Sequence, residues 1–271
     1  MSESRLDAFE KNGFYVYDKP VLSAELVSDV HDAMHMIMNG ENDTGMPARL
    51  DFWKPEDDPA ALVKIDNPQC ASKAITKLLK SPEMGAAVAA VTGAEMVQIW
   101  TTQLLYKPPQ SDDGDKVQGV GWHQDWTYWN TNWKEGADLF TAWVAISDVK
   151  EESGPMKFIA RSHSWQKPGG GNFWGDNSAK DFEVPEGEEW NEVTATMPSG
   201  ALSVHDCHTL HGSGPNESSQ ARYSFALHMR SEKSFPLPGD PEFSRSSRID
   251  DMDLCPIIYG DRIESAFTPQ D

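Results

Sequence analysis

Cysteine, long apolar runs and positive charge are all scarce in this 271-residue chain. Its three cysteines, Cys70, Cys207 and Cys255, lie far apart and match neither a zinc-binding spacing nor a disulfide framework. No apolar run reaches the ~18 residues of a membrane-spanning helix, and residues 1–10 lack the apolar stretch of a signal peptide. We therefore expect a reduced, cytoplasmic protein with no membrane partner.

Acidic residues outnumber basic ones by 43 to 23, which gives a formal net charge of -20. Such a chain repels phosphate groups, so we expect no nucleic acid partner. The acidity has two interpretations, which are solubility and attraction of a cationic substrate. Nothing in the sequence indicates an oligomeric state.

The chain begins with helical signals and continues with strand signals. Gly13 ends a short first helix, Ser23 caps a helix that runs to about Asn39, and Ser81-Pro82 opens another that ends at Gly93. Between them, residues 41–72 look rich in loops. Strand patterns then cover 14–17, 96–106, 139–149, 156–160, 200–206 and 222–229.

This order predicts a mainly β fold with flanking helices. We expect a double-stranded β-helix, of the jelly-roll or cupin-like type, with the N-terminal helices packed outside. Residues 1–271 would form a single domain, with a helical part over about 1–93, a jelly-roll core over about 94–232 and a C-terminal tail over 233–271.

The segment Gly121–Trp126 contains His123 and Asp125, which point the same way if the backbone is extended. A third ligand would complete a face of two histidines and one carboxylate, which suits non-heme Fe(II) oxygenases. A His-x-Asp pair alone is more often structural. Of the later histidines, His211 precedes a predicted rigid turn, Gly212–Asn216, and Arg222 follows in an apolar strand that suits a buried carboxylate partner.

Four blocks in a fixed order carry a family resemblance: His123-Gln124-Asp125, then Ser153-Gly154-Pro155-Met156 leading to Arg161-Ser162-His163, then His211–Asn216, then Arg222. Over roughly Lys64 to Arg230, the chain resembles the phytanoyl-CoA dioxygenase family of Fe(II)/2-oxoglutarate oxygenases. The resemblance implies that His123, Asp125 and His211 are the catalytic iron ligands. Related halogenases have a small residue in place of Asp125, so the carboxylate implies hydroxylation.

The same resemblance implies a binding site for 2-oxoglutarate. Arg222 would hold its distal carboxylate, with Ser213 beside it, and Lys64, Trp143 and Gln103 would make further contacts. The implied requirements are Fe(II), 2-oxoglutarate and O2, with ascorbate as a supporting reductant. The other histidines are expected to be hydrogen-bonded structural residues: His163, His205, His208 and His228.

Aromatic residues crowd the segment that carries the first two ligands. They form either a hydrophobic wall or a surface that faces a cation, because ammonium groups bind over ring faces. The candidate substrate residues are Trp126, Tyr128, Trp129 and Trp174, and residues 168–177 are a candidate lid. We expect a small polar substrate that carries an ammonium group, such as an amino-acid derivative, a betaine, an ectoine-like solute or an aminophosphonate.

Other functions remain open at this point. The pocket would sense 2-oxoglutarate without turnover in one alternative, and would hydroxylate an acyl thioester or a secondary metabolite in another. A zinc hydrolase with the same three ligands is a further alternative. It needs a general base and gives no reason for Arg222.

Overall fold

The computed structural model describes residues 3–48, 54–58, 61–110, 119–165, 171, 173, 182–238 and 248–270. The helices are α1 (Arg5–Asn12), α2 (Ala24–Met38), α3 (Lys73–Leu79), α4 (Pro82–Thr92) and the short α5 (Trp126–Trp129). The strands are β1 (Phe14–Val16), β2 (Val63–Asp66), β3 (Val97–Lys107), β4 (Val120–His123), β5 (Leu139–Ala145), β6 (Met156–Ile159), β7 (Glu192–Ala195), β8 (Leu202–Asp206), β9 (His211–Ser213), β10 (Arg222–Arg230) and β11 (Ile257–Tyr259).

The predicted helix ends are confirmed by their capping residues. The hydroxyls of Ser23 and Ser81 accept hydrogen bonds from backbone amides in the first turns of α2 and α4. Gly13 and Gly93 end α1 and α4 with φ of 83° and 69°, a left-handed conformation that glycine adopts without steric cost. These helices therefore begin and end where the local sequence dictates.

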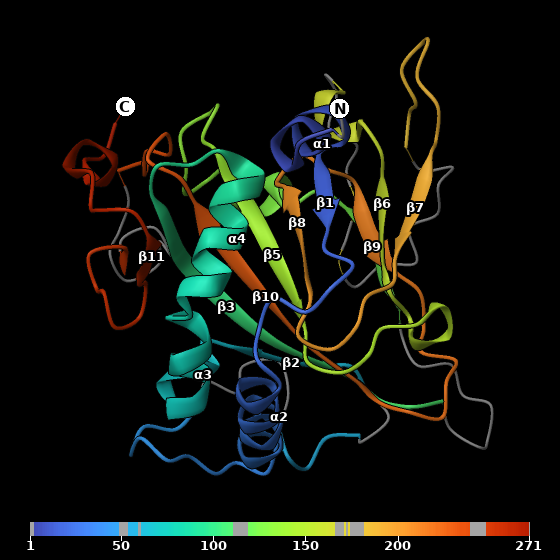
Figure 1. Cartoon of the computed structure of the whole chain (residues 1–271), viewed down its shortest axis with the longest axis vertical. Helices are drawn as coiled ribbons and strands as arrows, with labels where there is room; N and C mark the ends of the chain where they lie inside the picture. Colours follow the sequence, from blue (N-terminus) through green and yellow to red (C-terminus); the bar gives the residue numbers. More distant parts are fainter. Residues whose placement is uncertain are drawn as a thin grey trace.

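Two antiparallel sheets form the β part of the molecule (Figure 1). The larger has the strand order β1-β8-β5-β10-β3-β11, with β2 also paired to β3, and the smaller has the order β4-β9-β6-β7. This arrangement confirms the predicted mainly β, jelly-roll type of fold.

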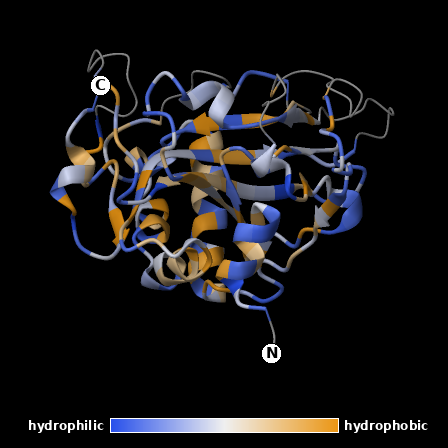
Figure 2. Ribbon diagram, turned by 90° about the horizontal axis from the view of Figure 1, so that it is seen from above, coloured by the Kyte–Doolittle hydropathy of each residue, from blue (hydrophilic) through white to orange (hydrophobic). Residues whose placement is uncertain are grey.

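Helices α2, α3 and α4 lie on one side of the large sheet (Figure 1 and Figure 2). The apolar face of α2 shares one core cluster with Phe140 of β5 and with Phe225 and Leu227 of β10. Because side chains alternate along a strand, the other face of β10 presents Arg222, Ala226 and His228. Helices therefore cover one face of the large sheet, and the side chains on its other face are available to form a binding site.

The C-terminal tail, predicted only as a tail, adds a strand to the large sheet. Strand β11 pairs with β3, and the buried guanidinium of Arg230 donates to the carbonyls of Ser234 (2.9 Å) and Ala266 (2.7 Å). The same guanidinium lies 4.4 Å from the ring centroid of Phe267. These contacts anchor the tail beside the strands.

Three predictions of local structure were incomplete or wrong. Helix α3 was not predicted, although Ile75, Leu78 and Leu79 form a buried face. The loop-rich region 41–72 contains β2, and the predicted turn at Gly212–Asn216 begins as strand β9. Strand β9 forms because β4 pairs with one of its edges and β6 with the other. That residues 1–271 form one domain stays a prediction.

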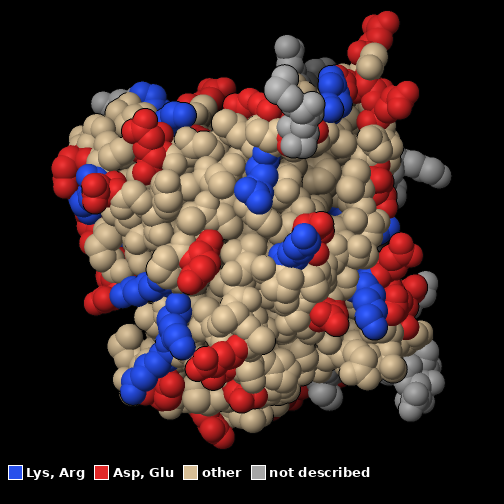
Figure 3. Space-filling model, in the orientation of Figure 1, with Lys and Arg blue, Asp and Glu red and all other residues tan. Residues whose placement is uncertain are grey.

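Lysine and arginine side chains are scattered among acidic ones on the face drawn in Figure 3. Among the described residues, no helix is long and apolar enough to cross a bilayer. All three cysteines are free thiols.

Candidate active site

The three side chains that the sequence singled out come together in the structure. His123 is the last residue of β4, His211 is the first residue of β9, and the two residues are paired in register. The Nε2 atoms of both histidines lie 3.8 Å from Oδ1 of Asp125. One ligand atom from each residue lies within 4.8 Å of the others, and all three side chains are buried.

Backbone carbonyls fix the orientation of both imidazoles. Nδ1 of His123 lies 2.8 Å from the carbonyl oxygen of Gly121, and Nδ1 of His211 lies 2.9 Å from that of Thr209. Because a carbonyl oxygen can only accept, each Nδ1 carries the proton and each Nε2 keeps its lone pair. Both Nε2 atoms are therefore oriented as metal ligands.

Burial also keeps these imidazoles neutral. It lowers the pKa of His123 below the ordinary value, and it lowers the pKa of His211 further, with His123 as the second cause. A neutral imidazole is the form that binds a metal ion.

The carboxylate of Asp125 is held from its other side. Its Oδ2 accepts a hydrogen bond of 2.9 Å from the hydroxyl of Thr141 and lies 3.5 Å from Nε2 of His205. The Thr141 hydroxyl also lies 2.9 Å from Nδ1 of His228. Burial alone would raise the pKa of Asp125, but His211 and His205 outweigh it and hold that pKa below its usual range. Oδ1 thus stays ionised and faces the two histidines.

Two neutral imidazoles and one carboxylate converge from one side on a single position. This donor set fits a divalent metal ion there. Non-heme Fe(II) oxygenases use this set and leave the adjacent coordination positions open. The hydrogen bond that Thr141 donates, and those that the carbonyls of Gly121 and Thr209 accept, fix the ligands in advance, as is usual around bound metals.

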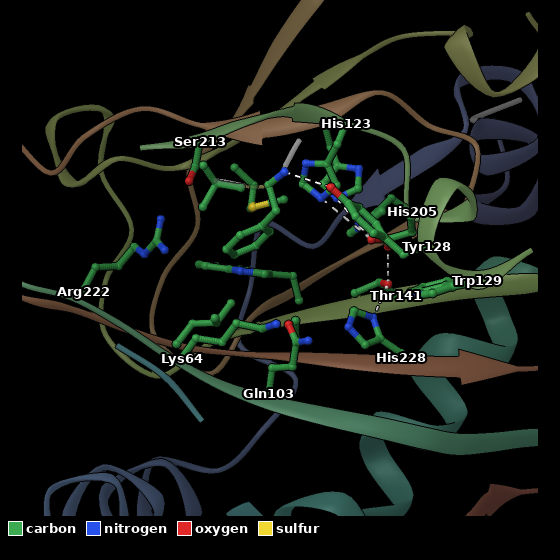
Figure 4. A pocket seen from close by; sticks show the side chains of 18 of the residues that line it. Lys64, Gln103, His123, Tyr128, Trp129, Thr141, His205, Ser213, Arg222 and His228 are labelled. Carbon is green, nitrogen blue, oxygen red and sulfur yellow. Dashed lines mark hydrogen bonds and ion pairs between the residues drawn. The ribbon is translucent and has the colours of Figure 1, made fainter. Parts of the chain in front are cut away.

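A cavity of about 420 Å³ opens beside these ligands, between the two sheets. Arg222 and Ser213 lie at one end, and His228, Trp129 and Thr141 lie at the other (Figure 4). The described residues that line it are Lys64, Gln103, Leu105, Val120, His123, Asp125, Tyr128, Trp129, Asn132, Thr141, Trp143, Met156, Phe173, His205, His211, Ser213, Arg222, Ala226 and His228.

The guanidinium of Arg222 is completely enclosed at its end of the cavity. It donates to the carbonyl oxygen of Gly154 and lies 5.1 Å from the ring centroid of Trp143, while none of the described residues accepts a hydrogen bond from its Nε. Burial lowers the pKa of Arg222 to about 9. A buried cation with an unused donor is suited to bind an anion from the cavity.

Comparison with known proteins decides the family. The family model described as phytanoyl-CoA dioxygenase (PhyH) matches residues 9–224, which is most of the chain. The chain belongs to the phytanoyl-CoA dioxygenase family. This membership confirms the resemblance that the ordered blocks of sequence had indicated.

Individual relatives are distant. A probable alpha-ketoglutarate-dependent hypophosphite dioxygenase of Stutzerimonas stutzeri is 26% identical over 66% of this chain and 60% of its own length. An ectoine dioxygenase of Halomonas elongata is 22% identical over 82% of this chain and 68% of its own length. The chain thus spans well under the full length of both relatives.

Solved structures agree on the fold. The epimerase SnoN, crystallised with Fe3+, alpha ketoglutarate and nogalamycin RO, superposes with a TM-score of 0.64 over 86% of this chain and 85% of its own, at 20% identity. At that identity, the likeness concerns the fold alone.

All five residues predicted to contact 2-oxoglutarate in this PhyH chain lie on the cavity wall. Lys64 of β2, Gln103 of β3 and Trp143 of β5 all line it, as do Arg222 and Ser213. The ammonium of Lys64 lies 3.9 Å from a carboxylate oxygen of Asp66 and 5.4 Å from the ring centroid of Phe173. Strands β2, β3, β10 and β5 are neighbours in the large sheet, whereas Ser213 comes from β9 of the small sheet.

The four candidate substrate residues do not all lie at the cavity. Tyr128 and Trp129 line the cavity, and the Tyr128 hydroxyl accepts a 2.9 Å hydrogen bond from the amide of Phe173. Trp126 instead packs against His208, with ring centroids 5.3 Å apart, and is not among the lining residues. Trp174 lies outside the described residues, as does most of the candidate lid 168–177.

Sequence reasoning missed several lining residues of this PhyH site. His205 and His228 were expected to be structural, yet both line the cavity, and Nε2 of His205 lies 3.5 Å from Oδ2 of the ligand Asp125. Thr141 was not predicted at all. The alternation of side chains along a strand could have identified two of these residues. It puts His228 on the same face of β10 as Arg222, and Thr141 on the same face of β5 as Trp143.

Proposed function

We propose that this protein is an Fe(II)- and 2-oxoglutarate-dependent dioxygenase that hydroxylates a C–H bond of a small polar molecule. The observation that carries the proposal is the convergence of His123, Asp125 and His211 in a cavity that also holds the buried cation of Arg222. In this proposal, succinate and carbon dioxide are the products formed with the hydroxylated substrate, at the expense of 2-oxoglutarate and O2.

The residues would act as follows. His123, Asp125 and His211 hold Fe(II), which supplies the activation of O2 when bound. Arg222 and Ser213 bind the distal carboxylate of 2-oxoglutarate, and Lys64, Gln103 and Trp143 contact the rest of it. Enclosure of the site excludes water and strengthens these electrostatic contacts.

The substrate would occupy the end of the cavity near Tyr128 and Trp129. Their rings suit an ammonium group. A small polar molecule with an ammonium group therefore fits this end of the cavity, such as an amino-acid derivative, a betaine, an ectoine-like solute or an aminophosphonate. The named activities of the two relatives concern small polar compounds as well.

A substrate screen tests this proposal. Purified protein is incubated with Fe(II), ascorbate, 2-oxoglutarate and candidate ammonium compounds, and succinate is measured against a control with the Asp125→Ala variant. We expect succinate in excess of uncoupled turnover with at least one small ammonium compound, and none above background with the variant. Preference for acyl-CoA esters over small ammonium compounds would contradict the substrate class.

Anaerobic spectroscopy separates the competing functions. Addition of Fe(II) and 2-oxoglutarate is expected to give a weak visible charge-transfer band. The band without succinate formation by any candidate would favour a 2-oxoglutarate sensor. Absence of the band together with zinc-dependent hydrolysis would favour a hydrolase and refute the proposal.

A further inference from the structure

A second buried cation, Lys107, lies directly behind the Arg222 end of the cavity. Lys107 is the last residue of β3 and pairs in register with Arg222 of β10. It has no solvent exposure, and it lies on the same face of β3 as Gln103 and Leu105, which line the cavity. Lys107 itself is not a lining residue, so it would act on a ligand through a neighbour.

That neighbour is Ser213. The ammonium of Lys107 donates to Oγ of Ser213 at 2.8 Å and to the carbonyl oxygen of Gly214 at 2.5 Å. An ammonium has no lone pair, so Ser213 can only accept in this bond. In the described part of the chain the Ser213 hydroxyl makes no second hydrogen bond, which leaves its own proton for a ligand in the cavity.

Two positive charges are therefore buried side by side. Burial lowers the pKa of Lys107 well below its usual value, and the charge of Arg222 lowers it further. Neither cation forms an ion pair with a carboxylate among the residues that the structure describes. Buried charges are ordinarily paired, so this end of the cavity has the electrostatics of a binding site for an anion.

We propose that Lys107 is a positioning residue that makes the Ser213 hydroxyl a hydrogen-bond donor to the distal carboxylate of 2-oxoglutarate and adds a second positive charge behind it. This inference rests on the proposed function. It explains how the site would distinguish a dicarboxylic 2-oxo acid from one that ends in a methyl group, because Arg222, Ser213 and Lys107 all act on the distal end alone.

The test compares two 2-oxo acids of equal chain length. Both 2-oxoglutarate and 2-oxopentanoate can chelate Fe(II), but the second has a methyl group in place of the distal carboxylate. Dissociation constants are measured by anaerobic titration of the Fe(II)-loaded protein, with the visible charge-transfer band as the signal. The ratio of the two constants within one preparation does not depend on how much of that preparation is folded.

In Lys107→Met, which removes the charge and keeps the length, we expect the constant for 2-oxoglutarate to rise about tenfold or more. The constant for 2-oxopentanoate should stay within about twofold. Lys107→Gln keeps a donor for Ser213 without a charge and should fall between the wild type and Lys107→Met. In a Ser213→Ala background, Lys107→Met should have a smaller effect, because part of its action passes through the hydroxyl.

A merely structural lysine would give a different result. It would weaken binding of both 2-oxo acids equally, or of neither, and either outcome would overturn the inference. Failure of the proposed function is recognised separately, because the wild-type protein would then give no charge-transfer band with either acid.

Discussion

The hydroxyl of Thr141 offers a sharp test of the metal site, because it touches the carboxylate of Asp125 from the side away from His123 and His211. Thr141→Val preserves the shape of the side chain and removes the 2.9 Å hydrogen bond to Oδ2. A hydrogen bond to a charged group contributes about 1.5–3 kcal/mol, and loss of such support for a metal ligand typically weakens metal binding about 10- to 100-fold. We expect Fe(II) binding to weaken within that range, toward its lower end, since His205 still lies 3.5 Å from Oδ2.

The assay is an anaerobic competition for Fe(II) between the protein and a coloured chelator, at a fixed concentration of 2-oxoglutarate. Thr141→Ser is the matched control, because it keeps the hydroxyl and loses a methyl group, and it should bind Fe(II) nearly as the wild type does. Equal affinity in Thr141→Val and the wild type would refute the role of this hydrogen bond. Equal weakening in both variants would show that the effect does not depend on the hydroxyl, because Thr141→Ser keeps it.

Two further predictions concern the co-substrate and pH. Arg222→Ala should raise the dissociation constant for 2-oxoglutarate by about 30- to 4,000-fold, because truncating one side of a buried charge pair costs about 2–5 kcal/mol. It should affect the turnover number less, and a variant with unchanged 2-oxoglutarate dependence would show that the anion binds elsewhere. The lowered pKa values of His123 and His211 mean that the unfolded chain takes up protons near pH 6.5 while the folded apo-protein does not. The free energy of unfolding should therefore decrease as pH falls below about 6.5, measured as a lower urea midpoint at pH 5.5 than at pH 8, and an unchanged midpoint would contradict this argument.

The helices and long strands were predictable because local signals define them. Ser23 and Ser81 start their helices with a side-chain cap, and Gly13 and Gly93 end theirs. Strands β5 and β10 are long and apolar enough to be recognised by composition. Strand β9 has the sequence His-Gly-Ser, which carries no such signal, and its pairing with β4 and β6 is a tertiary effect. Strand β7 is short and largely polar, so a periodic pattern could not indicate it.

The residues of the candidate site could likewise be predicted only where a local motif marks them. A motif with a fixed order of blocks predicted His123, Asp125, His211 and Arg222, all of which meet at one cavity. The aromatic residues near the metal ligands were a weaker guide to the site. This one segment supplies side chains to both the apolar core and the cavity. Trp133 packs against Trp100 with ring centroids 5.5 Å apart, whereas Trp129, four residues earlier, lines the cavity. Spacing alone did not separate these two tryptophans.

Polar side chains that would ordinarily be solvated are buried where the two sheets meet at the Arg222 end. Lys107 of the large sheet bonds to Ser213 and Gly214 at the end of β9, and Asn216 returns a bond of 2.9 Å to the carbonyl of Pro108. Arg222 reaches across to the carbonyl of Gly154.

Glycine at position 154 permits this close approach. It has a φ of 65°, and a Cβ there would lie 2.7 Å from the carbonyl oxygens of Gly214 and Pro215. The Ser-Gly-Pro-Met block of the family resemblance thus has a physical role, since it brings the start of β6 against the turn after β9. The same hydrogen bonds that join the sheets also orient Arg222 and Ser213 toward the cavity. The distance between the metal ligands and the anion-binding end is therefore set by contacts between the two sheets.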